Sequence, residues 1–288
     1  MPTRSSLICG SQRTGSWLLC QALATTGLAG DPKEFFLPEL WPITAEQWGV
    51  VHRSAAMLDQ VRRRGTSANG VFGSKMMWNY FDEAVAWIRE LSPEPGPASG
   101  LGSSADLLRC ALPDLRFVWI RREDEVRQPV SWWRAGSTNH YVAPADGTST
   151  PTPEYDKATL DGFVVLVRAG NAGWAAWFEQ HGIEPLEVVY EDMVADLAGT
   201  VRDVLTFLDV DGVARHGRID VPVPDSLMTR QAGDATEVIV ARYLVDRRRR
   251  DPALRDVRAR HPEVCDVRPR WRGPSEGRGY GVGRRGRA

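Results

Sequence analysis

A loop of small and polar residues between two apolar runs is the feature that most limits how this chain can fold. In the stretch LICGSQRTGSWLL, residues 7–19, apolar residues without alternation precede the loop, as in a strand buried on both faces of a parallel sheet. Apolar residues then recur at helical spacing from Trp17 to Leu23. The stretch therefore predicts a buried strand, a tight loop and a helix, the usual start of a parallel α/β fold.

The chemistry of this loop predicts an anion site at the beginning of the helix. Gly10 and Gly15 let backbone amides converge, and the free amides of the first helical turn favour a negative group. The guanidinium of Arg13, inside the loop, suits bidentate contact with phosphate. Ser16 and Trp17 stand where a nucleotide-binding P-loop has lysine and then serine or threonine, which argues against a metal-assisted kinase or ATPase. The alternative interpretation is a tight turn with a solvated arginine.

Length, charge and cysteine usage narrow the class of protein. The chain has 288 residues and a net charge of −1, which favours one large domain and gives no overall indication of a nucleic-acid partner. Its four cysteines show no paired spacing, so we expect neither a disulfide framework nor a zinc site, as suits a reducing cytoplasm. The apolar stretches are too short to span a bilayer, so no membrane partner is expected.

Strands and helices alternate along the rest of the chain. Apolar runs predict strands at residues 71–77, 116–120 and 186–190. Helices are predicted at residues 44–64, 79–91, from about 123 onward, and at 154–180 and 191–208. Segments 92–104 and 136–153 are rich in glycine, proline and small polar residues and predict surface loops, the second with the length of a functional lid. The alternation predicts a single α/β domain with a central parallel sheet flanked by helices.

The end of the chain differs in composition from the rest. Residues 245–288 carry 14 arginines against 6 acidic residues. We therefore place the folded domain at residues 1–245 and expect residues 246–288 to form a flexible arginine-rich tail.

Six segments in order carry a family resemblance: SQRTGSWLL, TGLAGDPKEFF, GVFGSKMMWN, IRREDEVRQPVSWWRA, GWAAWF and RQAGD. Over about residues 5–245 the chain resembles the sulfotransferases that use 3′-phosphoadenosine 5′-phosphosulfate (PAPS), and most closely the mycobacterial trehalose 2-sulfotransferase group. It implies an enzyme that moves the sulfuryl group of PAPS, its co-substrate, to a hydroxyl of a small carbohydrate, with trehalose 2-O-sulfation as the best match. No metal is required, and a cytoplasmic homodimer is implied.

The resemblance also implies a role for individual residues. The catalytic pair is Glu34, as the base, and Arg13, on the leaving group. The donor-binding residues are Arg13, Thr14, Gly15, Ser16 and Trp17 for the 5′-phosphosulfate, Arg122 and Ser131 for a 3′-phosphate far from Arg13, and Arg230 and Gln231 in a late loop that closes over the nucleotide. The acceptor-binding residues are Gln12, Asp31, Pro32, Lys33, Glu34, Phe35, Phe36, Leu37 and Trp48. Lys75, Trp78 and Asn79 match a further family segment without an assigned role.

Some positions depart from the family pattern and keep alternatives open. Trp17 replaces a small hydroxyl residue of the donor loop, and Asp31, Lys33 and Leu37 replace glutamate and two glutamines of the sugar segment. One alternative is the same chemistry on a glycosylated or hydroxylated secondary metabolite. Another is a non-catalytic module that binds 3′-phosphoadenosine 5′-phosphate (PAP) or a related nucleotide. His52 and His140 are the alternative bases.

Overall fold

Four parallel strands form the centre of the molecule. The computed structural model describes residues 1–91, 102–138, 153–210 and 234–249. The strands are β1 (Arg4–Gly10), β2 (Val71–Met77), β3 (Leu115–Arg121) and β4 (Leu186–Val189). They lie in the order β2-β1-β3-β4, and every neighbouring pair is parallel. The predicted α/β fold with a central parallel sheet is confirmed, and β2 has the predicted bounds.

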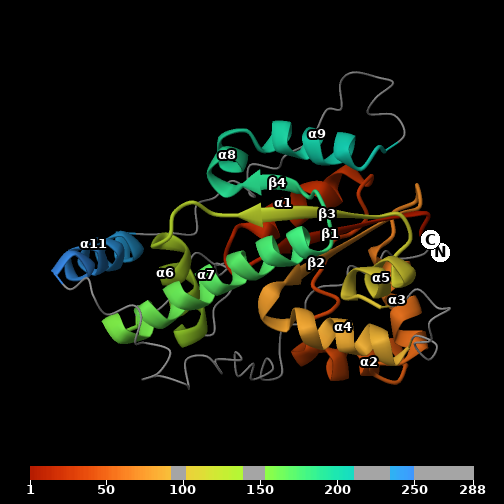
Figure 1. The fold of residues 1–288 in the computed structure, drawn as a ribbon, viewed down its shortest axis with the longest axis horizontal. Helices are drawn as coiled ribbons and strands as arrows, with labels where there is room; N and C mark the ends of the chain where they lie inside the picture. The colour runs from red at the N-terminus through yellow and green to blue at the C-terminus, as the bar shows by residue number, and fades with distance from the viewer. Residues whose placement is uncertain (92–101, 139–152, 211–233, 250–288) are drawn as a thin grey trace, which may run out of the picture.

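Helices cover both faces of this sheet (Figure 1). They are α1 (Ser16–Thr26), α2 (Trp41–Trp48), α3 (Ala55–Gly65), α4 (Phe81–Glu90), α5 (Ser104–Ala111), α6 (Arg127–Thr138), α7 (Lys157–Gln180), α8 (Tyr190–Ala195), α9 (Leu197–Phe207) and α11 (Asp234–Arg249). Leu7 and Cys9 of β1 join the core beneath α4, α5 and α7, whereas Ile8 joins the core beneath α1 and α9. Successive side chains of a strand point to opposite faces, so a strand buried on both faces needs a continuous apolar run.

Two of the predicted helices are each divided into two. The helix predicted at residues 44–64 is α2 and α3, because Gly49 adopts a left-handed conformation (φ 66°) that ends α2. The side chain of Ser54 then caps α3 by accepting a hydrogen bond from the Met57 amide. The helix predicted at residues 191–208 is α8 and α9, since Asp196 leaves the helical conformation and caps α9 at the Gly199 amide.

Two helix starts differ from the sequence-based expectation. The helix predicted to begin at residue 79 begins at Phe81, because Trp78–Tyr80 form a short 3₁₀ turn before α4. The helix α5, which was not predicted, begins at the last residue of the segment 92–104 predicted as a loop. Its start is a capping box in which Ser103 and Asp106 exchange side-chain and backbone hydrogen bonds, a signal that the surrounding glycines and prolines obscured.

The last described helix runs past the predicted end of the domain. The boundary between residues 245 and 246 falls inside α11, which continues to Arg249. Asp246 accepts a hydrogen bond from the Tyr155 hydroxyl at 2.8 Å, and Arg247 lies 3.8 Å from the Glu125 carboxylate. The lid predicted at residues 136–153 begins later, because residues 136–138 belong to α6. The remainder of the predicted tail, residues 139–152 of the predicted lid and His140 within them lie outside the described residues.

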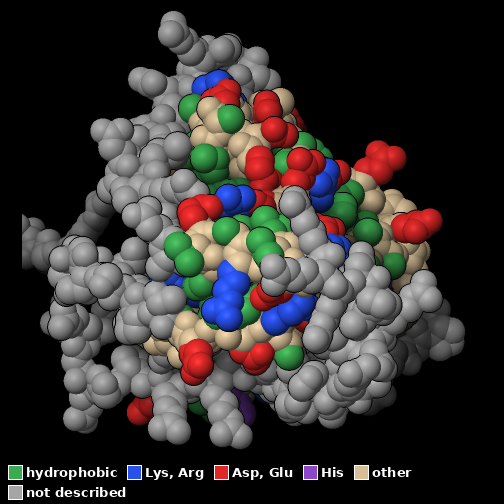
Figure 2. Space-filling view, turned by 90° about the vertical axis from the view of Figure 1, so that its left-hand side faces the viewer, with side chains coloured by type: hydrophobic (Ala, Val, Ile, Leu, Met, Phe, Trp, Pro, Cys, Tyr) green, Lys and Arg blue, Asp and Glu red, His purple; other side chains and the backbone are tan. Residues whose placement is uncertain are grey.

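The carboxyl ends of all four strands meet at one edge of the sheet, where parallel α/β folds bind ligands. Figure 2 looks onto this end of the molecule and shows basic and acidic side chains interspersed over its described surface. Within the described ranges, no helix combines the length and the apolar character needed to cross a bilayer.

Candidate active site

The loop between β1 and α1 has the tight geometry that its glycines predict. Gly15 is left-handed (φ 85°), and a Cβ atom there would lie 2.3 Å from the Tyr190 ring. Arg13 is also left-handed, with a φ of 67°. Thr14 is fully buried, and its hydroxyl donates to the carbonyl of Ser11 at 3.1 Å. The Thr14 hydroxyl is thus used inside the loop, which leaves the backbone amides at the start of α1 as the anion-binding groups of this turn.

Three side chains from α6 and α7 hold the first half of this loop. Gln128, which is 0% exposed, donates to the Ser11 hydroxyl at 2.8 Å and to the Gln12 carbonyl at 2.7 Å. The Ser11 hydroxyl in turn donates to Asn171 at 2.9 Å. The indole of Trp174 donates to the Gly10 carbonyl at 2.9 Å. Sequence reasoning missed Gln128 and Asn171, since nothing in their local sequence indicates contact with a loop more than a hundred residues away.

Arg13 and Ser131 lie together rather than at two distant anion sites. Nε of Arg13 donates to the Ser131 hydroxyl at 3.0 Å, which joins the loop to the middle of α6. The expectation that Ser131 lies far from the loop is therefore wrong. The physical reason is that α6 packs back across the carboxyl edge of the sheet, where Gln128 already contacts the loop three residues before Ser131.

Arg122 lies beside β3 and α8 and is largely buried. Its guanidinium stacks over the Tyr190 ring at 4.4 Å, and its Nε is 3.5 Å from the Glu191 carboxylate. That Nε is buried and has no hydrogen-bond partner among the described residues. A buried guanidinium with unused hydrogen-bonding capacity fits an anionic ligand such as phosphate.

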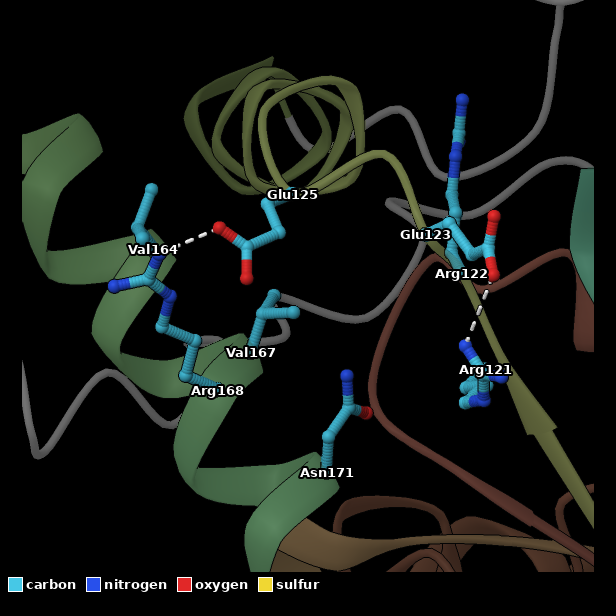
Figure 3. Close-up of a pocket in the computed structure, with 8 residues that line it drawn as sticks. All are labelled: Arg121, Arg122, Glu123, Glu125, Val164, Val167, Arg168 and Asn171. Atoms are coloured by element: carbon cyan, nitrogen blue, oxygen red, sulfur yellow. Dashed lines mark hydrogen bonds and ion pairs between the residues drawn. The ribbon is translucent and has the colours of Figure 1, made fainter. Parts of the chain in front are cut away.

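A cavity of about 330 Å³ opens between the end of β3 and the middle of α7. Two valines and six polar or charged residues line it: Arg121, Arg122, Glu123, Glu125, Val164, Val167, Arg168 and Asn171 (Figure 3). Arg168 is ion-paired with Glu125, and Arg121 with Glu123, so two of its cations are already neutralised within the wall. Among the residues that the structure describes, no group of three or more His, Cys, Asp or Glu side chains could hold a metal ion.

The segment predicted to bind the acceptor runs along the edge of the sheet beside β2. The Lys33 carbonyl accepts from the Lys75 amide at 2.9 Å and from the Ser74 hydroxyl at 2.9 Å, which attaches the turn to β2. Lys33 and Asp31 form an exposed ion pair at 2.5 Å, and Pro32 is buried against Gly73.

The two phenylalanines of this segment anchor it in the core. Phe36 is 0% exposed and packs on Trp87, and Phe35 stacks on Phe72 and lies against Trp48. The acceptor-binding role predicted for Phe36 is therefore corrected to an anchoring role, because a fully buried ring has no surface to offer a sugar. Leu37 is half-buried beside the same core.

The carboxylate of Glu34 is held on both oxygens. Nζ of Lys75 lies 2.8 Å from Oε2, and the Tyr80 hydroxyl donates to Oε1 at 3.1 Å. Burial alone would lower the pKa of Lys75, but the neighbouring Glu34 carboxylate outweighs burial, and the pKa of Lys75 lies above its usual value. Burial raises the pKa of the Tyr80 hydroxyl well above its usual value, so Tyr80 stays protonated and remains a donor. The Gln12 side chain, on the loop side, donates to Asn79 at 3.3 Å.

The other predicted site residues are spread around this centre. Trp17 is 40% exposed on the first turn of α1, and Trp48 carries the guanidinium of Arg64 over its ring at 4.8 Å. Ser16 is buried at the start of α1. Arg230 and Gln231 lie outside the described residues.

Comparison with known proteins shows which family this chain matches. Residues 5–246 match the model of the family described as Stf0 sulphotransferase. A protein of Mycolicibacterium smegmatis named trehalose 2-sulfotransferase is 30% identical over 266 residues, which cover 84% of this chain and 95% of that protein. A protein of the same name from Mycobacterium tuberculosis is 28% identical over 268 residues, which cover 83% and 94%.

The similarity of this chain to a solved structure is weaker than its similarity to these two proteins. The sulfotransferase domain of the Synechococcus PCC 7002 olefin synthase superposes with a TM-score of 0.38 at 16% identity, covering 92% of this chain and 94% of that domain. The family match spans the sheet, the anion loop and the segment around Glu34, and it confirms the resemblance inferred from the motifs. The chain belongs to the Stf0 sulphotransferase family.

Proposed function

We propose that this sulfotransferase transfers the sulfuryl group of PAPS to a hydroxyl of trehalose, at the 2-position. The observation that carries the proposal is the likeness to two trehalose 2-sulfotransferases along nearly their whole lengths. The family match over residues 5–246 includes the turn that holds Glu34 and the loop that holds Arg13, the two residues to which we assign the chemistry. On the same grounds we propose a cytoplasmic homodimer that uses no metal.

The residues at the carboxyl edge of the sheet fit a donor with two anionic ends. The amides at the start of α1, with Arg13, would hold the 5′-phosphosulfate, and Arg122 would hold the 3′-phosphate through its guanidinium. Ser131, bonded to Arg13, would link the two ends. PAPS, as the substrate, supplies the activated sulfur. Arg13 would stabilise the negative charge that develops on the departing phosphate, as preorganised cations do in phosphoryl transfer.

We assign Glu34 as the base that accepts the proton of the acceptor hydroxyl. As the hydroxyl oxygen of the sugar bonds to sulfur, the bond from sulfur to the 5′-phosphate oxygen breaks, and PAP leaves with the electron pair. The proton of the hydroxyl passes to Glu34. The Glu34 side chain is 21% exposed, so it is not sealed from an acceptor although both carboxylate oxygens have protein partners.

The test is to incubate the full chain with PAPS and trehalose and to identify the product by mass spectrometry and NMR. We expect a sulfated disaccharide carrying the ester at the 2-position, together with one PAP for each ester formed. Glucose and a panel of glycosylated and hydroxylated metabolites serve as competing acceptors, because Asp31, Lys33 and Leu37 depart from the family pattern. Transfer to a metabolite but not to trehalose would replace the acceptor, and tight PAP binding without any transfer would contradict the catalytic assignment.

A further inference from the structure

Lys75 holds the turn that carries Glu34 at two points. Its backbone amide donates to the Lys33 carbonyl at 2.9 Å, so β2 pairs with the residue next to Glu34. Its ammonium group reaches the carboxylate itself at 2.8 Å. Lys75, a strand residue, contacts both the backbone of the turn at Lys33 and the side chain of Glu34. The position of Glu34 is therefore set by the rigid sheet rather than by the surface turn alone.

Tyr80 contacts the other oxygen of the Glu34 carboxylate. It lies in the 3₁₀ turn after β2, is 3% exposed, and donates to the second carboxylate oxygen at 3.1 Å. With Lys75 on Oε2 and Tyr80 on Oε1, rotation of the carboxylate would break a bond to a charged donor or leave a buried hydroxyl unsatisfied. The carboxylate plane is therefore fixed from two directions.

We propose that Lys75 and Tyr80 are positioning residues of the sulfuryl transfer, which act through Glu34 by fixing its carboxylate toward the acceptor hydroxyl. The proposal rests on the proposed function, in which Glu34 accepts the proton. Lys75 remains a cation while Glu34 changes charge, so it keeps a donor directed at the carboxyl group before and after proton transfer. A role through Glu34 differs from direct contact with the donor, and the two make different predictions in a double-mutant cycle.

The cycle compares the wild type, Lys75→Met, Glu34→Gln and the double variant, with PAPS and trehalose both saturating. Loss of a general base typically lowers kcat by about 10²- to 10⁴-fold, and we expect this range for Glu34→Gln. We expect Lys75→Met to lower kcat by roughly tenfold or more, the size of one lost charged hydrogen bond. In the Glu34→Gln background the same substitution should change kcat by less than about threefold, because residues that act as a unit are not additive.

A second double-mutant cycle pairs Tyr80→Phe with Glu34→Gln. Tyr80→Phe is the milder substitution, since it removes only one oxygen from a buried ring. We expect kcat to fall by about 2- to 10-fold, again only while Glu34 is present. If Lys75→Met does not fold, this variant decides the proposal. PAP affinity should stay within about twofold of wild type for both, as residues that act on the acceptor side should not bind the nucleotide.

Lys157→Met is the matched control. Lys157 also forms a partly buried ion pair, at 2.6 Å with Asp161 on α7, and lies outside the site. The substitution Lys157→Met should lower Tm and leave kcat unchanged, so it separates the effect of lost stability from the effect of a misplaced Glu34.

The outcomes separate this proposal from the proposed function. Full losses from Lys75→Met or Tyr80→Phe in the Glu34→Gln background, or a matching loss of PAP affinity, would overturn the positioning role and leave Glu34 as the base. Wild-type turnover in Glu34→Gln would remove the base and the positioning role together. If trehalose is not sulfated at all, the proposed acceptor fails, and the cycle is run with the acceptor that the metabolite panel identifies.

Discussion

The surroundings of Arg122 allow the most specific prediction about the donor, which is that Arg122 binds its 3′-phosphate. It is held over Tyr190 and near Glu191, and its buried Nε has no hydrogen-bond partner among the described residues. We expect Arg122→Ala to weaken PAP binding by roughly 10- to 100-fold, the size of one lost charge-assisted hydrogen bond to phosphate. Adenosine 5′-phosphosulfate, which has no 3′-phosphate, should bind almost as before, and calorimetry with both nucleotides measures the difference.

Arg116→Ala is the control for this prediction. Arg116 lies nearer the opposite end of β3, and its guanidinium bonds the Phe207 carbonyl rather than facing the carboxyl edge. Its loss should reduce stability and leave both affinities unchanged. Equal losses of the two nucleotides in Arg122→Ala would contradict a 3′-phosphate role.

At the scale of elements, α1 offers a matched pair of glycines at its two ends. Gly15 and Gly27 are both left-handed, with φ of 85° and 66°. A Cβ at Gly27 would meet nothing within 4 Å, whereas one at Gly15 would meet the Tyr190 ring at 2.3 Å. Gly27→Ala should therefore cost only the backbone strain, about 1–2 kcal/mol of unfolding free energy, and leave PAP affinity unchanged. Gly15→Ala should cost more and also weaken PAP binding, because Tyr190, which supports Arg122, must move.

Thermal unfolding and PAP titration of the two variants check this pair. Equal behaviour of Gly15→Ala and Gly27→Ala would show that close packing on Tyr190 does not shape the anion loop.

At the scale of the whole molecule, α11 is the last described element that packs on the domain. Tyr243 is 1% exposed, and its hydroxyl donates to the buried Asp161 of α7 at 2.6 Å. Ile239 and Val240 share an apolar cluster with α6 and α7. A chain ending after Arg249 keeps these contacts, so we expect its turnover and Tm to match the full chain.

A chain ending after Arg242 removes Tyr243 and Asp246 and leaves Asp161 without the Tyr243 donor. We expect Tm to fall by on the order of 10 °C, as loss of a large buried aromatic costs about 3–5 kcal/mol. Differential scanning calorimetry of the two truncated chains and the full chain measures both effects. Loss of turnover in a folded chain that ends after Arg249 would mean that the arginine-rich end belongs to the site or to the dimer.

The sequence by itself determined the parts of this protein whose signals are local. An apolar run without alternation marks β1, because a strand between two helical layers is buried on both faces. The glycines and Arg13 mark the anion loop, because a tight strand-to-helix turn needs backbone conformations that glycine adopts freely.

Only the tertiary structure decided which of these parts meet. Arg13 and Ser131 are 118 residues apart in the chain, Ser11 and Gln128 are 117 apart, and Glu34 and Tyr80 are 46 apart, yet each pair is hydrogen-bonded. No local pattern encodes these contacts, because they depend on strand order and on how α6 and α7 cross the carboxyl edge of the sheet. The breaks at Gly49 and Asp196 were missed for a different reason, because both are local signals that the apolar spacing outweighed: a left-handed glycine that ends α2 and an aspartate that caps α9.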